Sequence, residues 1–300
     1  MSFLHSHTDP CLKSELDLFS VPLTQTALKT NRWVHYKPVS SLSDESPIEF
    51  VISSQNEDYI NLAHTMLRVN VTLTPYDKDR DALVAPVNNF LHSIFNQVDV
   101  YFNQKLVTPP NNTYPYRAYI ETLLNYGPAA KSSHLSTNLW ETDIAGIMDE
   151  LPGSKKNSVL TKRQEYLKDG KTVDLMGHLH CDVFNQDKLL LNGVEVRLRL
   201  VRAKDKDAFC LMDASTKNYS VSISEATLLV QRVKVSPTVL IAHAKTLANT
   251  TAKYPITHVE VKSFTLYSGI NGDSLDNVIL GQLPKRIILG FVDNKAFNRD

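Results

Sequence analysis

Apolar and polar side chains alternate along several stretches of the chain with the period of two that is typical of β-strands. In one of them Leu67, Val69 and Val71 share a side, and polar residues lie between them. The predicted strands are 48–52, 67–74, 98–103, 173–183, 194–200 and 228–235, and one short strand is predicted at 32–36, within the N-terminal arm. Because most of these strands have one apolar and one polar face, the pattern favours antiparallel sheets over a parallel sheet buried on both faces.

Helical periodicity is confined to a few short segments. Within 115–126 a stripe of apolar residues falls at helical spacing and is expected to pack against the sheets. The stripe consists of Tyr116, Tyr119, Ile120, Leu123 and Leu124. Pro115 suits the first helical position and Gly127 suits the exit. A second helix is predicted to open at Ser236, and a third helical turn covers 161–167.

Many strands with two or three short helices predict a mainly β protein, an antiparallel β-sandwich with decorated loops and a long irregular insertion at about 127–170. A doubly wound α/β fold would need a helix between most pairs of strands. Further strands are predicted at 259–266 and 287–292. A second sandwich needs about 100 residues. We therefore expect one complete sandwich and the opening of another, in a truncated chain.

Composition and charge narrow the class of protein. The chain has 32 basic and 32 acidic residues, and this balance argues against a surface that grips nucleic acid or anionic membranes. The three cysteines, Cys11, Cys181 and Cys210, are far apart, so neither a zinc site nor a disulfide framework is predicted. The first residues lack the features of a signal peptide, and no apolar run reaches the length of a membrane span. These observations predict a soluble intracellular protein.

One predicted strand carries a possible metal site. Asp174, His178, His180 and Asp182 have the same parity, and two histidines at i and i+2 can both bind a metal ion. The favoured alternative is the polar outer face of an antiparallel strand. Cys181 lies on the opposite, apolar face, which favours a buried hydrophobic residue over a nucleophile. His5 and His7 lie in the arm, where we expect no fixed geometry.

The remaining candidates have structural explanations that we favour over binding. The basic pairs at 155–156 and 162–163, and Lys204 with Lys206, fit solvated loops with acidic neighbours. Tyr114, Tyr116, Tyr119 and Tyr126 could stack on bases or sugars, but their helical spacing favours packing. No catalytic or phosphate-binding motif occurs. We therefore assign no catalytic, cofactor-binding or metal-binding residue, and we predict that the protein is not an enzyme.

Longer phrases of the sequence carry a family resemblance. PIEFVIS, EDYINLAHTML, NNFLHSIFNQVDVYFNQKLVTPPNNTYPYRAYIETLLNYG and LGQLPKRIILGFVDNKAFNRD occur in this order. From about Leu18 to Asp300 they resemble the major capsid protein of Polinton (Maverick) elements and adintoviruses. Phrases of this length are far more specific than a short motif.

The resemblance implies a hexon-like double jelly-roll subunit. Three copies of such a subunit form a pseudo-hexagonal trimer that tiles an icosahedral shell. On this interpretation 1–46 is an N-terminal arm, 47–235 the first jelly roll, 236–257 a linker helix and connection, and 258–300 the incomplete start of a second jelly roll. Family members continue further, which is a second reason to expect truncation. Asn88, Asn89 and Phe90 are expected to cap and staple the entry to the following strand.

The implied function is structural, in a virion capsid made inside the host cell and not secreted. The implied partners are further copies of the chain and a minor capsid (penton) protein, without specific nucleic-acid binding or membrane attachment by this chain. Two alternatives stay open. A carbohydrate- or receptor-binding β-sandwich would use exposed aromatic residues, with Trp33 and Trp140 as the only tryptophans. A metal enzyme of the cupin type would need inward-facing ligands, whereas Asp174, His178 and His180 are expected to face outward.

Overall fold

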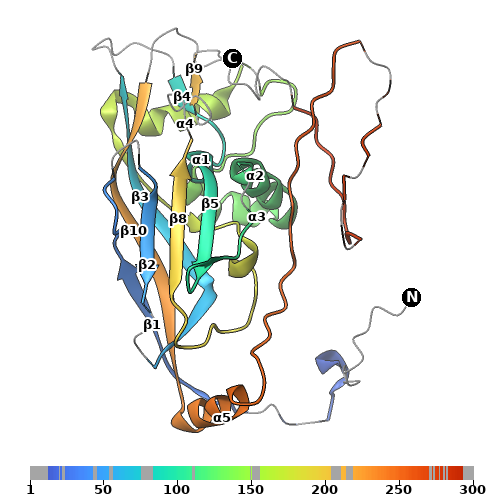
Figure 1. Cartoon of the computed structure of the whole chain (residues 1–300). Coiled ribbons are helices and arrows are strands. Elements are labelled where there is room, and N and C mark those ends of the chain that lie inside the picture. Colours follow the sequence, from blue (N-terminus) through green and yellow to red (C-terminus); the bar gives the residue numbers. More distant parts are fainter. Residues whose placement is uncertain are drawn as a thin grey trace.

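Two four-stranded antiparallel sheets face each other across a layer of apolar side chains (Figure 1). The structure is a computed structural model that describes residues 13–19, 21, 24–42, 46–53, 57–75, 84–109, 112–148, 150, 156–203, 211–213, 219–269, 272, 274–276, 278–279, 281 and 283–292. The first sheet has the order β1 (Leu28–Tyr36), β10 (Tyr219–Val235), β3 (Tyr59–Pro75), β7 (Thr172–His178). The second has the order β2 (Ile48–Ile52), β8 (Val196–Arg202), β5 (Phe95–Phe102), β6 (Lys105–Leu106).

The order of the strands defines a jelly roll. If β4 (Val84–Pro86) and β9 (Leu211–Asp213), which pair with each other apart from the two sheets, are set aside, eight strands remain. Numbered along the chain, these eight lie in the orders 1-8-3-6 and 2-7-4-5. Every step along the chain crosses from one sheet to the other except the β5–β6 hairpin. Two interlocked Greek keys of this kind form a jelly roll, so the predicted mainly β, antiparallel fold is confirmed.

The predicted alternation produces the apolar layer. In β2, Ile48, Phe50 and Ile52 are buried while the residues between them are partly exposed. Leu198 and Leu200 of β8 lie on the same inner face and pair with Phe50 and Ile48 across the ladder. Side chains of successive strand residues point to opposite faces, so a period of two places every second residue in the core.

The first strand corrects the predicted domain boundary. β1 pairs with β10 from Leu28, opposite Val235, to Tyr36, opposite Leu228. It therefore belongs to the sandwich and not to the arm expected over 1–46. β1 is an edge strand whose side chains are mostly exposed, so the hydrogen-bond ladder holds it in place and its sequence shows little alternation. The division between a first and a second jelly roll stays a prediction.

Helices decorate the two sheets. They are α1 (Phe90–Ser93), α2 (Tyr114–Asn125), α3 (Pro128–Lys131), α4 (Ser158–Leu167) and α5 (Pro237–Leu247). Single 3-10 turns are η1 (Ser14–Leu16), η2 (His134–Asn138), η3 (Lys168–Gly170) and η4 (Asp182–Phe184). As predicted, Pro115 lies in the first turn of α2 and Ser236 caps α5, where its hydroxyl accepts from the amide of Val239. α2 and α3 lie beside β5, outside the second sheet (Figure 1).

The entry to β5 is fastened by a side chain that the sequence singles out. The Asn88 amide oxygen accepts from the backbone amides of Asn89, at 2.9 Å, and Glu141, at 3.0 Å. Its amide nitrogen donates to the Glu141 carbonyl and to the Asp143 carboxylate. Asn89 immediately precedes α1, and its backbone has the left-handed conformation, with φ 60°. Its side chain makes no capping hydrogen bond. The predicted cap is therefore a clamp made by Asn88 between the start of α1 and the loop at 141–143, and Phe90 is buried as expected.

The chain after α5 does not form the strands predicted at 259–266 and 287–292. Among the described residues of 248–292 no helix or strand is present. The segment runs from α5 along the side of the molecule that carries α2 and α3 (Figure 1). Phe264, Ile287, Leu289 and Phe291 are exposed. Alternation specifies a strand only where another strand pairs with it, and no described strand pairs with these residues.

The buried face of α2 also differs from the predicted stripe. Tyr114, Ala118 and Thr122, spaced four residues apart, are buried, whereas Leu123 and Leu124 are 46% and 53% exposed. The helix packs through this line of mixed polarity because the line faces polar side chains, with Tyr114 against His92 and Thr122 against His180. Periodicity of apolar residues alone therefore selected the wrong face.

We expect Leu123→Asp to leave the melting temperature within about 2 °C of the wild type, because surface substitutions change stability by less than about 0.5 kcal/mol. Ala118→Asp places a carboxylate where the side chain is fully buried, and should cost roughly 3 kcal/mol or more. Thermal unfolding followed by circular dichroism measures both. A variant Leu123→Asp that unfolds as readily as Ala118→Asp would contradict this assignment of the two faces.

Candidate functional site: a polar network between α2 and the C-terminal segment

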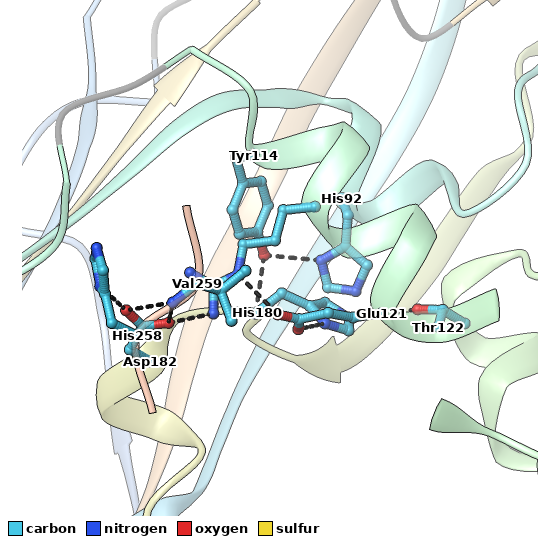
Figure 2. Close-up of polar contacts among 9 residues, drawn as sticks. His92, Tyr114, Glu121, Thr122, His180, Asp182, His258 and Val259 are labelled. Atoms are coloured by element: carbon cyan, nitrogen blue, oxygen red, sulfur yellow. Dashed lines mark hydrogen bonds and ion pairs between the residues drawn. The ribbon is translucent and has the colours of Figure 1, made fainter. Parts of the chain in front are cut away.

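Seven polar side chains meet where α1, α2 and η4 adjoin the chain that follows α5 (Figure 2). We call them the polar network. Its members are His92, Tyr114, Arg117, Glu121, His180, Asp182 and His258. All but His258 are buried or mostly buried, so their hydrogen bonds replace water that they have lost.

One end of the polar network joins α1 to α2. The Tyr114 hydroxyl lies 2.9 Å from Nδ1 of His92 and accepts from the backbone amide of His180 at 3.4 Å. The rings of His92 and His180 meet edge to face, with centroids 4.7 Å apart. Burial, and then the neighbouring His180 and His178, hold the pKa of His92 well below its ordinary value. Burial raises the pKa of Tyr114 well above its ordinary value, so both groups are neutral at pH 7.

The centre of the polar network is a carboxylate with two partners. Glu121 accepts from Nε of Arg117 at 2.8 Å and lies 2.7 Å from Nδ1 of His180. Burial on its own raises the pKa of Glu121, but the hydrogen bond from His180 and the charge of Arg117 outweigh burial and lower it. Burial on its own lowers the pKa of Arg117, but the charges of Glu121 and Asp182 outweigh burial, so this pKa is raised. Glu121 and Arg117 are therefore a charged pair at neutral pH.

The other end of the polar network reaches the C-terminal segment. Asp182 accepts from Nη2 of Arg117 at 2.5 Å, and its second oxygen lies 2.7 Å from Nδ1 of His258. The amide of Val259 donates to the same carboxylate at 3.3 and 3.4 Å. Three donors thus converge on Asp182, which satisfies a carboxylate that solvent barely reaches.

The arrangement ties α2 and η4 to the segment that contains His258 and Val259. Cys181, next to Asp182 in the chain, is buried, and burial raises its pKa to about 12. Its thiol therefore stays protonated and unreactive, as the sequence predicts. Glu121 and Asp182 share Arg117 as their partner, and each carboxylate lies 2.7 Å from a histidine nitrogen.

The predicted metal candidates do not come together. Asp174 is exposed and pairs with Arg68 at 2.6 Å, and Nε2 of His178 lies 2.9 Å from the Ala63 carbonyl. His180 and Asp182 are buried, contrary to the expectation that His180 faces outward, because β7 ends at His178 and the chain turns into η4. Within the described ranges no group of three or more His, Cys, Asp or Glu is placed to hold a metal ion. His5, His7, Cys11 and Cys210 lie outside the described residues.

The aromatic and basic candidates pack or pair. Tyr119 packs against the buried Trp140 at 5.3 Å between ring centroids, and Lys131 lies over the Trp140 ring. The exposed Trp33 meets His64 edge to face on the first sheet. Lys162 pairs with Glu141, Arg163 with Asp143 and Lys156 with Glu150. The other basic residues considered, Lys155, Lys204 and Lys206, lie outside the described residues.

A shallow hollow of about 270 Å³ lies on the outer face of the second sheet. Its lining is mostly charged and polar, and consists of Glu49, Tyr101, Gln104, Arg197 and Arg199. Arg199 lies 3.7 Å from Glu49 and 3.8 Å from the buried Asp99. With one aromatic side chain among charged and polar ones, the hollow does not resemble a sugar-binding groove, which would be lined by exposed Tyr and Trp.

Sequence reasoning missed His92, Arg117, Glu121 and His258 as members of the polar network. The spacing of four between Arg117 and Glu121 is a readable signal of a helical ion pair. Asp182 and His258 are 76 residues apart, and nothing local in the sequence connects them.

Comparisons with known proteins give a distant relative and several structural neighbours. No protein-family model matches the chain. The uncharacterized protein F54H12.2 of Caenorhabditis elegans is 24% identical over 291 residues, which cover 93% of this chain and 67% of that protein. Among the described helices, none is long and apolar enough to cross a membrane.

The similar solved structures are viral capsid proteins. The Faustovirus major capsid protein has a TM-score of 0.48 at 8% identity, over 77% of this chain and 58% of that one. PBCV-1 VP54, fitted into a reconstruction of the virophage Sputnik, has a TM-score of 0.47 at 11% identity, over 76% of this chain and 47% of that one. The Sputnik virophage structure has a TM-score of 0.42 at 12% identity, over 77% of this chain and 53% of that one. This chain thus spans about half the length of these chains, and the strand order given above is what defines its own fold.

We expect Arg117→Met to lower the free energy of unfolding by about 3–5 kcal/mol, because it leaves two buried carboxylates without their common partner. The matched control is Arg68→Met, which breaks the exposed pair with Asp174 and should cost much less, because water already screens that pair. Urea unfolding at pH 7 measures both. Equal losses in the two variants would show that the Arg117 pairs contribute no more than a surface ion pair.

Stability should also fall as the solution is made acidic. The pKa of His92 is lowered by burial, so below about pH 6.5 the unfolded chain binds a proton that the folded chain does not. We expect the free energy of unfolding to drop by up to about 1.4 kcal/mol per pH unit for this histidine as pH falls below that value. Urea unfolding between pH 7.5 and 5.5 measures the slope, and His92→Asn should make it shallower. An unchanged slope in that variant would contradict the burial of a neutral His92.

Proposed function

We propose that the chain is a structural subunit of a viral or transposon capsid, without enzymatic activity of its own. The observation that carries this proposal is the strand order, 1-8-3-6 and 2-7-4-5, which defines a jelly roll, a fold that serves in viral shells. The family resemblance of the sequence phrases supports the same conclusion. A jelly roll also occurs in lectins and cupins, so the site has to decide between these functions.

The geometry of the described residues favours assembly over those alternatives. A cupin binds its metal inside the barrel, whereas the inner faces of both sheets are lined by apolar side chains such as Phe50, Val69 and Leu198. A lectin of the kind considered would expose both tryptophans, whereas Trp140 is buried. The polar groups that do come together hold segments of the chain in place. A rigid wall whose polar groups are committed to each other is what a shell subunit requires.

We propose further that residues 258–292 begin a second jelly roll beside the first. In described parts of this segment a continuous apolar run is exposed, which consists of Ile287, Ile288, Leu289, Phe291 and Val292. Strongly exposed apolar side chains of this kind are typical of surfaces that another layer covers. On this proposal the two rolls form the double jelly roll that the resemblance to Polinton and adintovirus capsid proteins implies.

Association of three such subunits would use heterologous contacts, in which one face of a copy meets a different face of the next. Such contacts close into a ring when the rotation between copies is 120°. The formal net charge of zero supports this, because like-charged copies would repel each other in close packing. The proposal places the chain in the virion capsid, with a penton protein as its further partner.

We expect a product that contains the complete second jelly roll to form trimers, with three times the mass of one copy. Size-exclusion chromatography with light scattering measures the mass, and negative-stain electron microscopy should show pseudo-hexagonal particles or shells. A protein that stays monomeric up to millimolar concentration, and that is retained specifically on a glycan column, would favour the carbohydrate-binding alternative and contradict the capsid proposal.

A further inference from the structure

The C-terminal segment contacts the jelly roll through two groups of polar contacts spaced four residues apart. The first is the hydroxyl of Tyr254, and the second is the ring of His258 with the amide of Val259. We infer that the jelly roll carries a built docking site for an extended peptide, and that residues 254–259 of the chain itself occupy it. The site consists of Asp182 and the backbone of 189–191.

The backbone half of the site is oriented by β3. The amide and carbonyl of Leu190 bond to Ile60, at 2.8 and 3.0 Å. The C=O and N–H of one trans peptide group point in opposite directions, so the Leu189 carbonyl and the Leu191 amide point away from β3. Both meet the Tyr254 hydroxyl, which accepts from Leu191 at 3.1 Å and donates to Leu189 at 3.3 Å.

Tyr254 fits this position in chemistry as well as in geometry. A hydroxyl group can donate and accept at once, and the exposed carbonyl and amide of 189–191 require one of each. Burial raises the pKa of Tyr254, so the hydroxyl keeps its proton. Its ring packs against the apolar layer of the sandwich. Phenylalanine would keep the packing and lose both hydrogen bonds, which provides a clean test.

The acidic half of the site is Asp182, and neighbouring residues of the jelly roll hold its carboxylate in place. Arg117 holds Asp182 through one oxygen, and Glu121 with His180 holds Arg117 in turn. The second oxygen of Asp182 is left for the His258 ring, and the carboxylate also takes the Val259 amide (Figure 2). A group fixed by its own neighbours loses little freedom on binding, which favours association.

The spacing of the two contacts suits an extended peptide. Residues i and i+4 of an extended chain point to the same side and lie about 13 Å apart. Tyr254 and His258 have this spacing, so one extended segment can fill both halves of the site. The site therefore recognises a tyrosine, a histidine four residues later and the amide that follows it.

The consequence is that the chain after Val259 leaves the jelly roll from one fixed point. α5 contributes a separate contact, because Nδ1 of His243 lies 2.8 Å from the Tyr59 hydroxyl. The docking of 254–259 goes beyond the assembly proposal, since it occurs within one chain and needs no second copy. It assigns to Asp182 and Tyr254 the role of positioning residues for the segment that follows.

Limited proteolysis of the full chain tests the inference, at dilutions where it is monomeric. Trypsin cuts after Lys253 and Lys262, which flank the docked residues, and cleavage of a locally opened segment follows the population of its open form. We expect cleavage at these two bonds to rise about fivefold in Tyr254→Phe and in His258→Ala, and at least tenfold in the double variant. The matched control is Tyr267→Phe, at an exposed tyrosine of the same segment, which should change nothing.

Two references make the outcome decisive. A synthetic peptide of residues 248–266 gives the cleavage rate of the undocked segment, and the melting temperature of each variant shows whether the sandwich itself is intact. His258 is exposed, so His258→Ala is expected to leave the melting temperature unchanged. Wild-type cleavage as fast as that of the peptide, or equal rates in Tyr254→Phe, His258→Ala and Tyr267→Phe, would overturn the docking site. Neither result depends on whether the protein forms trimers.

Discussion

The apolar layer between the two sheets is the interaction on which the rest of the structure depends. It is formed by every second residue of strands that are distant in the chain, from Ile48 in β2 to Val230 in β10. With this layer buried between the sheets, the helices and the C-terminal segment pack on the outside of the sandwich. α2 and the C-terminal segment lie outside the sheets, and the polar network exists because these outer elements meet each other there and not in the core.

The sequence predicted the parts of the fold that a local pattern encodes. Strands such as 48–52 were recognisable because burial on one face imposes a period of two. β1 was assigned to the arm because an edge strand is held by its backbone ladder and needs little apolar alternation. The two strands predicted after residue 258 are absent from the described residues, since a pattern of side chains cannot supply the neighbour with which a strand must pair.

The polar network marks the limit of such reasoning more sharply. The apolar stripe of α2 was placed on Leu123 and Leu124, whereas the helix buries Ala118, Thr122 and Arg117. Its partners include carboxylates and histidines up to 66 positions away along the chain, and a helical periodicity count treats such polar positions as solvent-facing. The sequence indicated His180 and Asp182 as polar residues of interest, but as parts of one long strand. Their surroundings depend on the turn after β7, which the alternating pattern of 173–183 does not predict.

The place of β10 in the first sheet has a consequence for how the chain is made. Among the described strands β10 comes last in sequence, and yet it lies between β1 and β3. During synthesis both of these strands must therefore wait, with open hydrogen-bonding edges, until residue 235 has left the ribosome. Over that interval the nascent chain is at its most vulnerable to mispairing with its neighbours, because the first sheet stays incomplete until this strand arrives.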